Sequence, residues 1–261
     1  MQWGGSALPY LAGDPRFLEG TLYCGSVQQP LSFGPPPKAP PPAPALPRGV
    51  VHLPQFLLAS EVTALIHAVD SVTALQPFHI ALVNNPFNGD RAFTTLYLAY
   101  AGSFWHGVRK TYTPCGRSIP AEVLGLARRA IERASAEHPG VFPDLPSEAD
   151  WASPNTSFTC LFNYYPPQWG AISEHSDTSE PSLAEGKTFP VVSFSIGSAV
   201  DFSLGEGGAK TSLRLSSGDV LLFGGSARNI RHGIAGVCAA GARPTGLRMV
   251  AGRLNITLRR L

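Results

Sequence analysis

The stretch Arg253-Leu254-Asn255-Ile256-Thr257-Leu258-Arg259, near the C-terminus, decides the fold. Alternate side chains of an extended strand lie on the same face. Leucine and isoleucine would therefore share one face, while two arginines, an asparagine and a threonine would share the other. Arginine binds carboxylates through two parallel hydrogen bonds. The stretch is predicted to be a strand that packs on a core and lines a pocket for a small dianion, although an ordinary amphipathic edge strand would carry the same pattern.

A second motif is His175-Ser176-Asp177, with His232 much further along the chain. On a strand, His175 and Asp177 would leave the same face and could bind one metal ion. Two imidazoles and one carboxylate leave three positions of an octahedron open, which is the ligand set of non-haem Fe(II) oxygenases. His-x-Asp alone has low specificity, because any exposed loop can carry it. The other five of the seven histidines have no comparable partners.

Five motifs occur in a fixed order along the chain. They are Asn163-Tyr164-Tyr165, His175-x-Asp177, Gly218-Asp219-Val220-Leu221-Leu222-Phe223-Gly224-Gly225, Arg231-His232-Gly233-Ile234 and Arg253-x-Asn255-x-Thr257-x-Arg259. In order, spacing and residue type they resemble the AlkB family of Fe(II)- and 2-oxoglutarate-dependent dioxygenases, from roughly Gly49 to the C-terminus. Five motifs in register are far more specific than any one of them.

The resemblance implies a β-rich α+β fold: a double-stranded β-helix, or jelly roll, with N-terminal helices on one side and a substrate lid. The residues agree, because after Trp151 short strands alternate with Gly, Pro and Ser, as in closed or double-sheet β structures. The expected organisation is an N-terminal extension with a Pro-rich linker over 1–48, helices and a nucleotide-recognition lid over 49–150, and the β-helix core over 151–261. Residues 49–261 would form one AlkB-like domain.

Several elements can be predicted individually. Ser60 is expected to cap a helix from Glu61 to about Ser71, because a side-chain oxygen there can accept from the first turn. The remaining expectations are a strand at Gly49–Leu53, a turn-rich stretch at Asn84–Gly89, an aromatic strand region ending near Tyr112, a helix at Ala121–Ala136 and a turn at Gly218-Asp219 before a strand at Val220–Phe223.

The resemblance also implies the cofactors. His175, Asp177 and His232 would hold Fe(II), leaving positions for 2-oxoglutarate and O₂. Arg253 would pair with the distal carboxylate of 2-oxoglutarate. The residues expected to contact this cosubstrate are Asn163, Tyr165, Arg253, Asn255 and Arg259. The implied activity is oxidative dealkylation of N-alkylated bases in DNA or RNA, with release of aldehyde, succinate and CO₂.

The substrate residues are less strongly marked. Trp105 and Tyr112 are seven residues apart and resemble the tryptophan and tyrosine of the bacterial AlkB lid; a core aromatic beside a surface turn is the alternative. A flipped base is sandwiched by aromatic groups, and Arg109 adds a basic side chain nearby. Arg228 is a candidate phosphate contact. Ser179 stands where bacterial AlkB has an acidic residue that touches the base, so the lesion preference is expected to differ.

Composition constrains the class of protein. The chain has 261 residues, a net charge of +2, and no run of about eighteen apolar residues, so no membrane span is expected. Charge is segregated: seven Lys/Arg against three Asp/Glu in residues 87–133, one against eight in 134–190, and nine against two in 205–261. This distribution suits a basic phosphate-binding face, or an unevenly charged solvated surface. Four scattered cysteines without a CxxC pair favour reduced thiols.

The expected protein is therefore an intracellular, soluble monomer of the cytoplasm or nucleus that binds nucleic acid. A same-fold oxygenase acting on a protein side chain or a small metabolite is the alternative, and a catalytically silent binding module is a third possibility. The Pro-rich stretch before residue 48 is expected to be a linker or flexible arm, although it could dock a protein partner.

Overall fold

The computed structural model describes residues 45–75, 77–81, 96–107, 109–167, 170–205, 208, 210–237 and 252–261. The chain divides into two units, Met1–Pro42 and Ala43–Leu261, and every described residue belongs to the second. The Pro-rich stretch up to residue 44 and the turn-rich stretch Asn84–Gly89 lie outside the described residues. The predictions made for them stay predictions.

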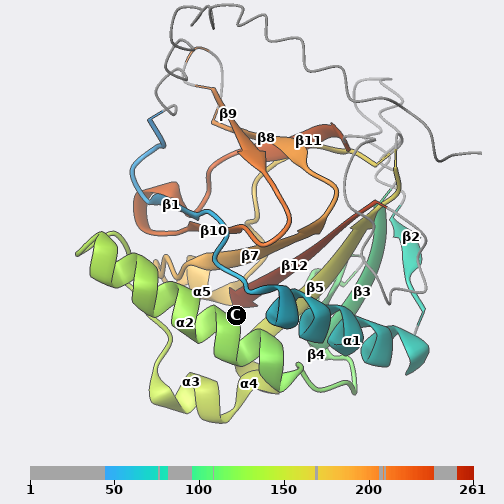
Figure 1. Ribbon diagram of the computed structural model, residues 1–261. Coiled ribbons are helices and arrows are strands. Elements are labelled where there is room, and N and C mark those ends of the chain that lie inside the picture. Colours follow the sequence, from blue (N-terminus) through green and yellow to red (C-terminus); the bar gives the residue numbers. More distant parts are fainter. Residues whose placement is uncertain are drawn as a thin grey trace, which may run out of the picture. The chain divides into compact units, whose positions relative to one another are not determined.

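Among the described residues, two antiparallel β-sheets face each other (Figure 1). The major sheet has eight strands in the order β1-β10-β7-β12-β5-β3-β2, with β4 paired to β3. Its strands are β1 Val50–Leu53, β2 His79–Ala81, β3 Leu96–His106, β4 Thr111–Pro114, β5 Phe158–Tyr165, β7 Val191–Gly197, β10 Val220–Phe223 and β12 Arg253–Arg260. The minor sheet, in the order β6-β11-β8-β9, contains β6 Ile172–His175, β8 Val200–Leu204, β9 Thr211–Leu215 and β11 His232–Val237. This is the predicted jelly-roll architecture.

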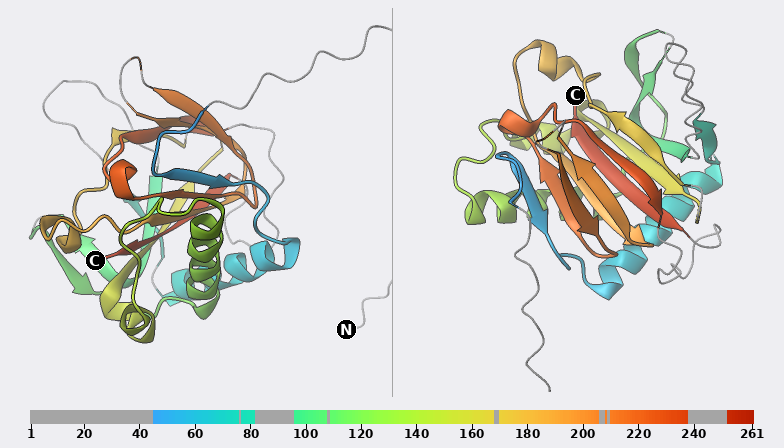
Figure 2. Two further views of the ribbon diagram at one scale, coloured as in Figure 1. Left: turned by 90° about the vertical axis from the view of Figure 1, so that its left-hand side faces the viewer. Right: turned by 90° about the horizontal axis from the view of Figure 1, so that it is seen from above.

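Two long helices, α1 Ala59–Leu75 and α2 Ala121–Glu137, cover the outer face of the major sheet (Figures 1 and 2). Short helices complete the described part: α3 Glu148–Ala152, α4 Pro154–Ser157, α5 Pro181–Ala184 and a 3-10 turn at Gly225–Ala227. The predicted second helix is confirmed to within one residue. No helix of the described residues is long and apolar enough to cross a membrane.

The start of α1 differs from the prediction. The helix begins at Ala59, so Ser60 lies inside its first turn and is not the cap. The backbone N–H of Leu58 instead donates to the side chain of Glu61, at 2.9 Å. The Glu61 carboxylate therefore satisfies one of the free N–H groups at this helix end.

The core has two parts, one on each face of the major sheet. The first lies under the helices and includes Leu65, Val123, Phe162 and Ile256. The second lies between the sheets and contains the buried residues Val191, Phe202, Leu204, Leu221 and Phe223. The major sheet is thus apolar on its helical face, whereas its other face can carry polar groups wherever the two sheets enclose a cavity.

Strand β12 occupies the middle of the major sheet. It pairs with β5 on one side and β7 on the other, and Arg253 to Arg259 are all buried. Leu254, Ile256 and Leu258 join the core under the helices. The alternative of an edge strand with a wet face is therefore wrong, and the polar row faces the space between the sheets.

Strand β3 changes partners at Gly102. It pairs with β5 up to Gly102, opposite Thr159, and with β4 from Ser103 onward. Gly102 has a φ of +72°, and a Cβ there would lie 2.8 Å from the carbonyl oxygen of Phe158. Only glycine adopts this backbone without strain. The hairpin formed by residues 103–114, called the lid hairpin below, departs from the sheet at this point.

Candidate metal centre and cosubstrate cavity

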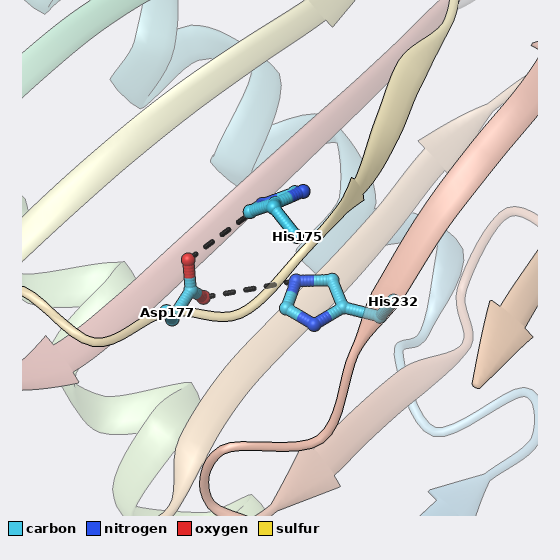
Figure 3. A group of neighbouring side chains, drawn as sticks. All are labelled: His175, Asp177 and His232. Atoms are coloured by element: carbon cyan, nitrogen blue, oxygen red, sulfur yellow. Dashed lines mark ion pairs between the residues drawn. The ribbon is translucent and has the colours of Figure 1, made fainter. Parts of the chain in front are cut away.

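The two predicted metal histidines face each other across the minor sheet. His175 ends β6, His232 begins β11, and the two are directly paired in register. Asp177 lies two residues beyond the end of β6, which corrects the expectation that His175 and Asp177 share a strand. Nε2 of His175 lies 3.7 Å from Asp177 Oδ1, and Nε2 of His232 lies 3.8 Å from Asp177 Oδ2 (Figure 3). One ligand atom from each residue lies within 4.8 Å of the other two, so the group could hold one metal ion.

Hydrogen bonds orient both imidazoles. Nδ1 of His175 lies 2.8 Å from the carbonyl oxygen of Ser173, and Nδ1 of His232 lies 3.0 Å from that of Ile230. A carbonyl can only accept, so each Nδ1 carries the proton and each Nε2 presents its lone pair toward Asp177. Burial lowers the pKa of His232 and outweighs the opposing charge of Asp177. The neutral ring is the form that binds a metal.

Asp177 is held in its ionised form. Burial alone would raise the pKa of this carboxyl group, but neighbouring positive charge, above all that of Arg259, lowers it below its usual value. Arg259 Nη1 lies 3.1 Å from Asp177 Oδ1. An anionic carboxylate between two neutral imidazoles is a donor set that suits Fe(II).

The triad opens into a cavity of about 170 Å³ between the two sheets. Pockets for drug-sized ligands have volumes of about 300–1,000 Å³, so this cavity suits a smaller molecule. The five residues predicted to contact the cosubstrate all line it: Asn163, Tyr165, Arg253, Asn255 and Arg259. Register explains the grouping, since Arg253 is opposite Tyr165 and Asn255 is opposite Asn163 across the β12–β5 ladder.

Arg253 is the most unusual group in the cavity. It is 1 % exposed, and its Nη2 donates to Ser195 Oγ at 2.9 Å. Its Nε and Nη1 have no hydrogen-bond partner among the described residues. Burial lowers the pKa of Arg253 to about 10. A buried guanidinium with unused N–H donors fits a carboxylate ligand, which would accept hydrogen bonds from it and balance its charge.

The sequence matches the 2OG-Fe(II) oxygenase superfamily over residues 49–259. The chain belongs to this superfamily. Its enzymes use Fe(II), 2-oxoglutarate and O₂, and the triad and Arg253 fit the first two of these groups.

Several relatives to which the chain is similar are enzymes of the AlkB type. It is 41 % identical over 163 residues to the DNA N(6)-methyladenine demethylase ALKBH1C of Arabidopsis thaliana, which covers 54 % of this chain and 32 % of the relative. It is 28 % identical over 208 residues to the alpha-ketoglutarate-dependent dioxygenase AlkB of Escherichia coli (strain K12), covering 75 % and 82 %. The solved structure of OsALKBH1 superposes with a TM-score of 0.65 at 26 % identity, covering 83 % of this chain and all of that one. The chain spans about a third of the length of its Arabidopsis relative.

Two serines near this cavity were not assigned from the sequence: Ser193 lines it, and Ser195 binds one of its lining residues. Asn255 Nδ2 donates to Ser193 Oγ at 2.7 Å, and Ser195 binds Arg253. Asn163 Nδ2 donates to Asn255 Oδ1 at 3.0 Å, so the amides are fixed relative to each other. The alternation of serine with apolar residues in β7 was visible in the sequence. Only the pairing of β7 with β12 shows that these serines meet the polar residues of β12.

Glu180 was also missed as a functional residue. It is 2 % exposed, and its carboxylate accepts from Tyr112 Oη at 2.8 Å, Arg228 Nη2 at 2.7 Å and Arg259 Nη1 at 2.7 Å. Arg259 also contacts Asp177, as noted above. This group of residues, called the Glu180 network below, connects the lid hairpin to a metal ligand. The available signal was an acidic residue directly after Ser179.

The lid hairpin brings together two predicted substrate residues. Trp105 and Tyr112 are directly paired, with ring centroids 5.2 Å apart. The Tyr112 hydroxyl lies 2.7 Å from Ser179 Oγ, and Lys110 Nζ lies 6.0 Å from the Trp105 ring centroid. Arg109 is exposed at the turn. The hairpin thus carries aromatic and basic side chains together. Its Tyr112 reaches Ser179, which lies two residues after Asp177.

Arg228 occupies a different place from the one expected. It is 3 % exposed, its Nη1 donates to the backbone oxygen of Asp177 at 2.7 Å, and its Nη2 binds Glu180. This corrects the expectation of a phosphate contact, since the guanidinium is already used inside the protein. Arg253 and Arg259 are buried as well, so the excess of basic residues in 205–261 is partly internal.

Proposed function

We propose that this protein is an Fe(II)- and 2-oxoglutarate-dependent dioxygenase that oxidatively demethylates N-alkylated bases in DNA or RNA. The observation that carries the proposal is one cavity with the His175–Asp177–His232 triad and, on its β12 wall, the Arg253 guanidinium, two of whose nitrogens have no hydrogen-bond partner among the described residues. When bound, Fe(II) and 2-oxoglutarate supply the oxidising chemistry, in which O₂ is consumed and 2-oxoglutarate becomes succinate and CO₂. The alkyl carbon leaves as an aldehyde.

The chain's own residues orient the reactants. Arg253, helped by Tyr165 and Asn255, would bind the carboxylate of 2-oxoglutarate that lies away from the metal. Asn163 and Arg259 would contact the end of the molecule near the metal. Both sheets bury this cavity, and apolar residues complete its wall. Exclusion of water strengthens each of these polar contacts, because the local dielectric constant is low.

The lid hairpin would receive the base. Trp105 offers a face on which a flipped base can stack, and such stacking contributes about 1–3 kcal/mol per base. Ser179 adds a neutral hydroxyl, and the charge of Glu180 is balanced by Arg228 and Arg259. None of these residues therefore offers a carboxylate without a cationic partner, which is the group that would favour a positively charged base. We therefore place the neutral base N6-methyladenine, named in the relative from Arabidopsis, first among the substrates.

A formaldehyde-release assay tests the proposal. Single-stranded DNA and RNA oligonucleotides carrying N6-methyladenine, 1-methyladenine or 3-methylcytosine would be incubated with protein, Fe(II) and 2-oxoglutarate. We expect formaldehyde and succinate in equal amounts from at least one oligonucleotide, with both lost in Asp177→Ala. His67→Ala, at an exposed position of α1, is the matched control and should retain activity. Succinate without formaldehyde from every oligonucleotide would favour an oxygenase of proteins or small metabolites instead.

A further inference from the structure

A second cleft lies outside the catalytic cavity, beside the lid hairpin. It has a volume of about 470 Å³, within the range of ligand sites of about 300–1,000 Å³. None of its lining residues is acidic, and none of them lines the catalytic cavity. The residues that matter for its chemistry are His79, Tyr100, Phe104, Trp105, His106 and Arg117.

Four rings form a continuous row in this cleft. His79 and Tyr100 are stacked at 15°, with centroids 6.3 Å apart. Phe104 lies 6.1 Å from Tyr100 on one side and 6.1 Å from His106 on the other. His79 is exposed and the other three are partly exposed. Rings that served only the core would be covered, whereas these keep accessible faces.

A guanidinium sits among the rings. Arg117 Nε donates to the backbone oxygen of Tyr100 at 2.9 Å, which fixes the side chain at the cleft. No carboxylate of the described residues is paired with it. Arg109 and Lys110 lie at the turn of the lid hairpin, and both are exposed. Accessible rings flanked by cations are the combination that binds single-stranded nucleic acid without reading its sequence.

The cleft is next to the place where the substrate base is expected. Trp105 lines the cleft and is also the ring paired with Tyr112. A nucleotide beside a base held at Trp105 would therefore reach the row of rings. The aromatic row favours the flat face of a base, and the Arg117 guanidinium favours the phosphate next to that base.

We propose that this cleft stacks an unmodified base that neighbours the target base on a single strand of nucleic acid. The inference rests on the proposed function for the target base, but the stacking itself needs neither Fe(II) nor 2-oxoglutarate. A binding measurement can therefore test it separately from turnover.

The first test measures the affinity for a short unmethylated single-stranded oligonucleotide by fluorescence anisotropy. Phe104→Leu removes the central ring and keeps an apolar side chain. We expect it to weaken binding by about 5- to 150-fold, which corresponds to the loss of one stacked base. Phe189→Leu, at a partly buried phenylalanine outside the cleft, is the matched control and should bind as the wild type does.

A second variant guards against misfolding. His106→Ala changes a partly exposed ring at the end of the row, and we expect a smaller loss in the same direction. If Phe104→Leu does not fold, as judged by circular dichroism, the oligonucleotide affinity of His106→Ala tests the proposal by itself. Wild-type affinity in every variant that folds would overturn the proposal.

The third test asks whether the occupant is a base. In an oligonucleotide with N6-methyladenine, the neighbouring nucleotide would be made abasic on either side in turn. We expect one of these changes to weaken binding to the wild type and to have no further effect in Phe104→Leu. Equal affinity of the wild type for all of these oligonucleotides would overturn the proposal, because the cleft would then hold a phosphate or another partner.

Failure of the proposed activity has a different signature. If no oligonucleotide yields formaldehyde but Phe104→Leu still weakens binding, the demethylase proposal fails and the stacking cleft stands. With a methylated mononucleotide, which is too short to reach the cleft, Phe104→Leu should turn over at the wild-type rate. A loss of mononucleotide turnover equal to the loss of oligonucleotide binding would make Phe104 a structural residue of the hairpin and overturn the proposal.

Discussion

At the scale of single residues, the buried environment of Arg253 favours the binding of an anion. Two of its nitrogens have no partner among the described residues, and Ser195 binds the third. A lysine at this position would keep the charge but could not donate two parallel hydrogen bonds. We predict that Arg253→Lys raises the apparent KM for 2-oxoglutarate by at least about tenfold, which corresponds to about 1.4 kcal/mol.

Steady-state kinetics with varied 2-oxoglutarate would measure this effect. Arg133→Lys, at an exposed arginine of α2, is the control and should leave the KM as it is. An unchanged KM in Arg253→Lys would mean that the polar face of β12 serves some other ligand.

Tyr112 is the residue through which the Glu180 network would act on the substrate. Burial raises the pKa of Tyr112 above its usual value, so its hydroxyl stays protonated and donates to Glu180. Tyr112→Phe removes only this hydroxyl, and we expect it to lower the free energy of unfolding by no more than about 1–2 kcal/mol. Glu180→Gln removes the carboxylate partner of the buried Arg228 and one of the two carboxylate partners of Arg259, and should cost about 3–5 kcal/mol.

Both variants should loosen the lid relative to Asp177. The measurement is the ratio of succinate formed to formaldehyde released, with urea unfolding for stability. We predict a higher ratio than wild type in both, since 2-oxoglutarate would be consumed without a correctly placed base. A wild-type ratio in Tyr112→Phe would show that the hydroxyl has no part in placing the lid.

At the scale of elements, Gly102 determines where the lid hairpin leaves the sheet. Alanine there would have to adopt a φ of +72° and would place a Cβ 2.8 Å from backbone and side-chain atoms. We predict that Gly102→Ala lowers the free energy of unfolding by about 1–3 kcal/mol, the cost of a strained backbone. Gly125→Ala is the control, because Gly125 lies in α2 with open space around its Cα and should gain about 0.5–1 kcal/mol. Urea unfolding would compare them, and wild-type stability in Gly102→Ala would contradict this account.

The elements also show how far sequence can be taken. The alternation in Arg253–Arg259 was sufficient to predict both faces of β12, because the period of a strand is a local property. Its central position depends on pairing with β5 and β7, which alternation does not encode. The same reason explains Ser193 and Ser195, whose polar pattern was visible but whose target was not. The predicted cap of α1 was wrong because the helix begins before Ser60, at Ala59, and the Glu61 side chain accepts from the Leu58 N–H at that end.

The metal triad was predicted from the sequence, whereas the surroundings of Arg228 were not, because they depend on contacts between distant residues. Motif spacing brought His175, Asp177 and His232 together correctly, although Asp177 lies beyond its strand. Arg228 was predicted to contact a phosphate, but it is buried. Its burial follows from Glu180, and two charges become compatible with the interior only as a pair. Such pairing depends on residues 48 positions apart and has no local signal.

At the scale of the whole molecule, the metal triad joins strands far apart in the sequence. A ligand that binds only the folded state stabilises it, by about 2.7 kcal/mol at one hundred times its Kd. We predict that Fe(II), added without oxygen, raises the Tm by several degrees, and that His175→Ala and His232→Ala abolish this shift. His67→Ala should show the full shift. A shift that survives in both triad variants would place the metal elsewhere.

The change of partners along β3 has an evolutionary consequence. One continuous strand lines the cavity through its first half and enters the lid hairpin, the proposed recognition surface, through its second, with a glycine between them. Substitutions in residues 103–114 can alter which polymer is accepted while the pairing of β3 with β5, and with it the cosubstrate cavity, is inherited unchanged. We therefore expect that exchange of this twelve-residue segment is enough to change the substrate, because the rest of the site keeps its structure.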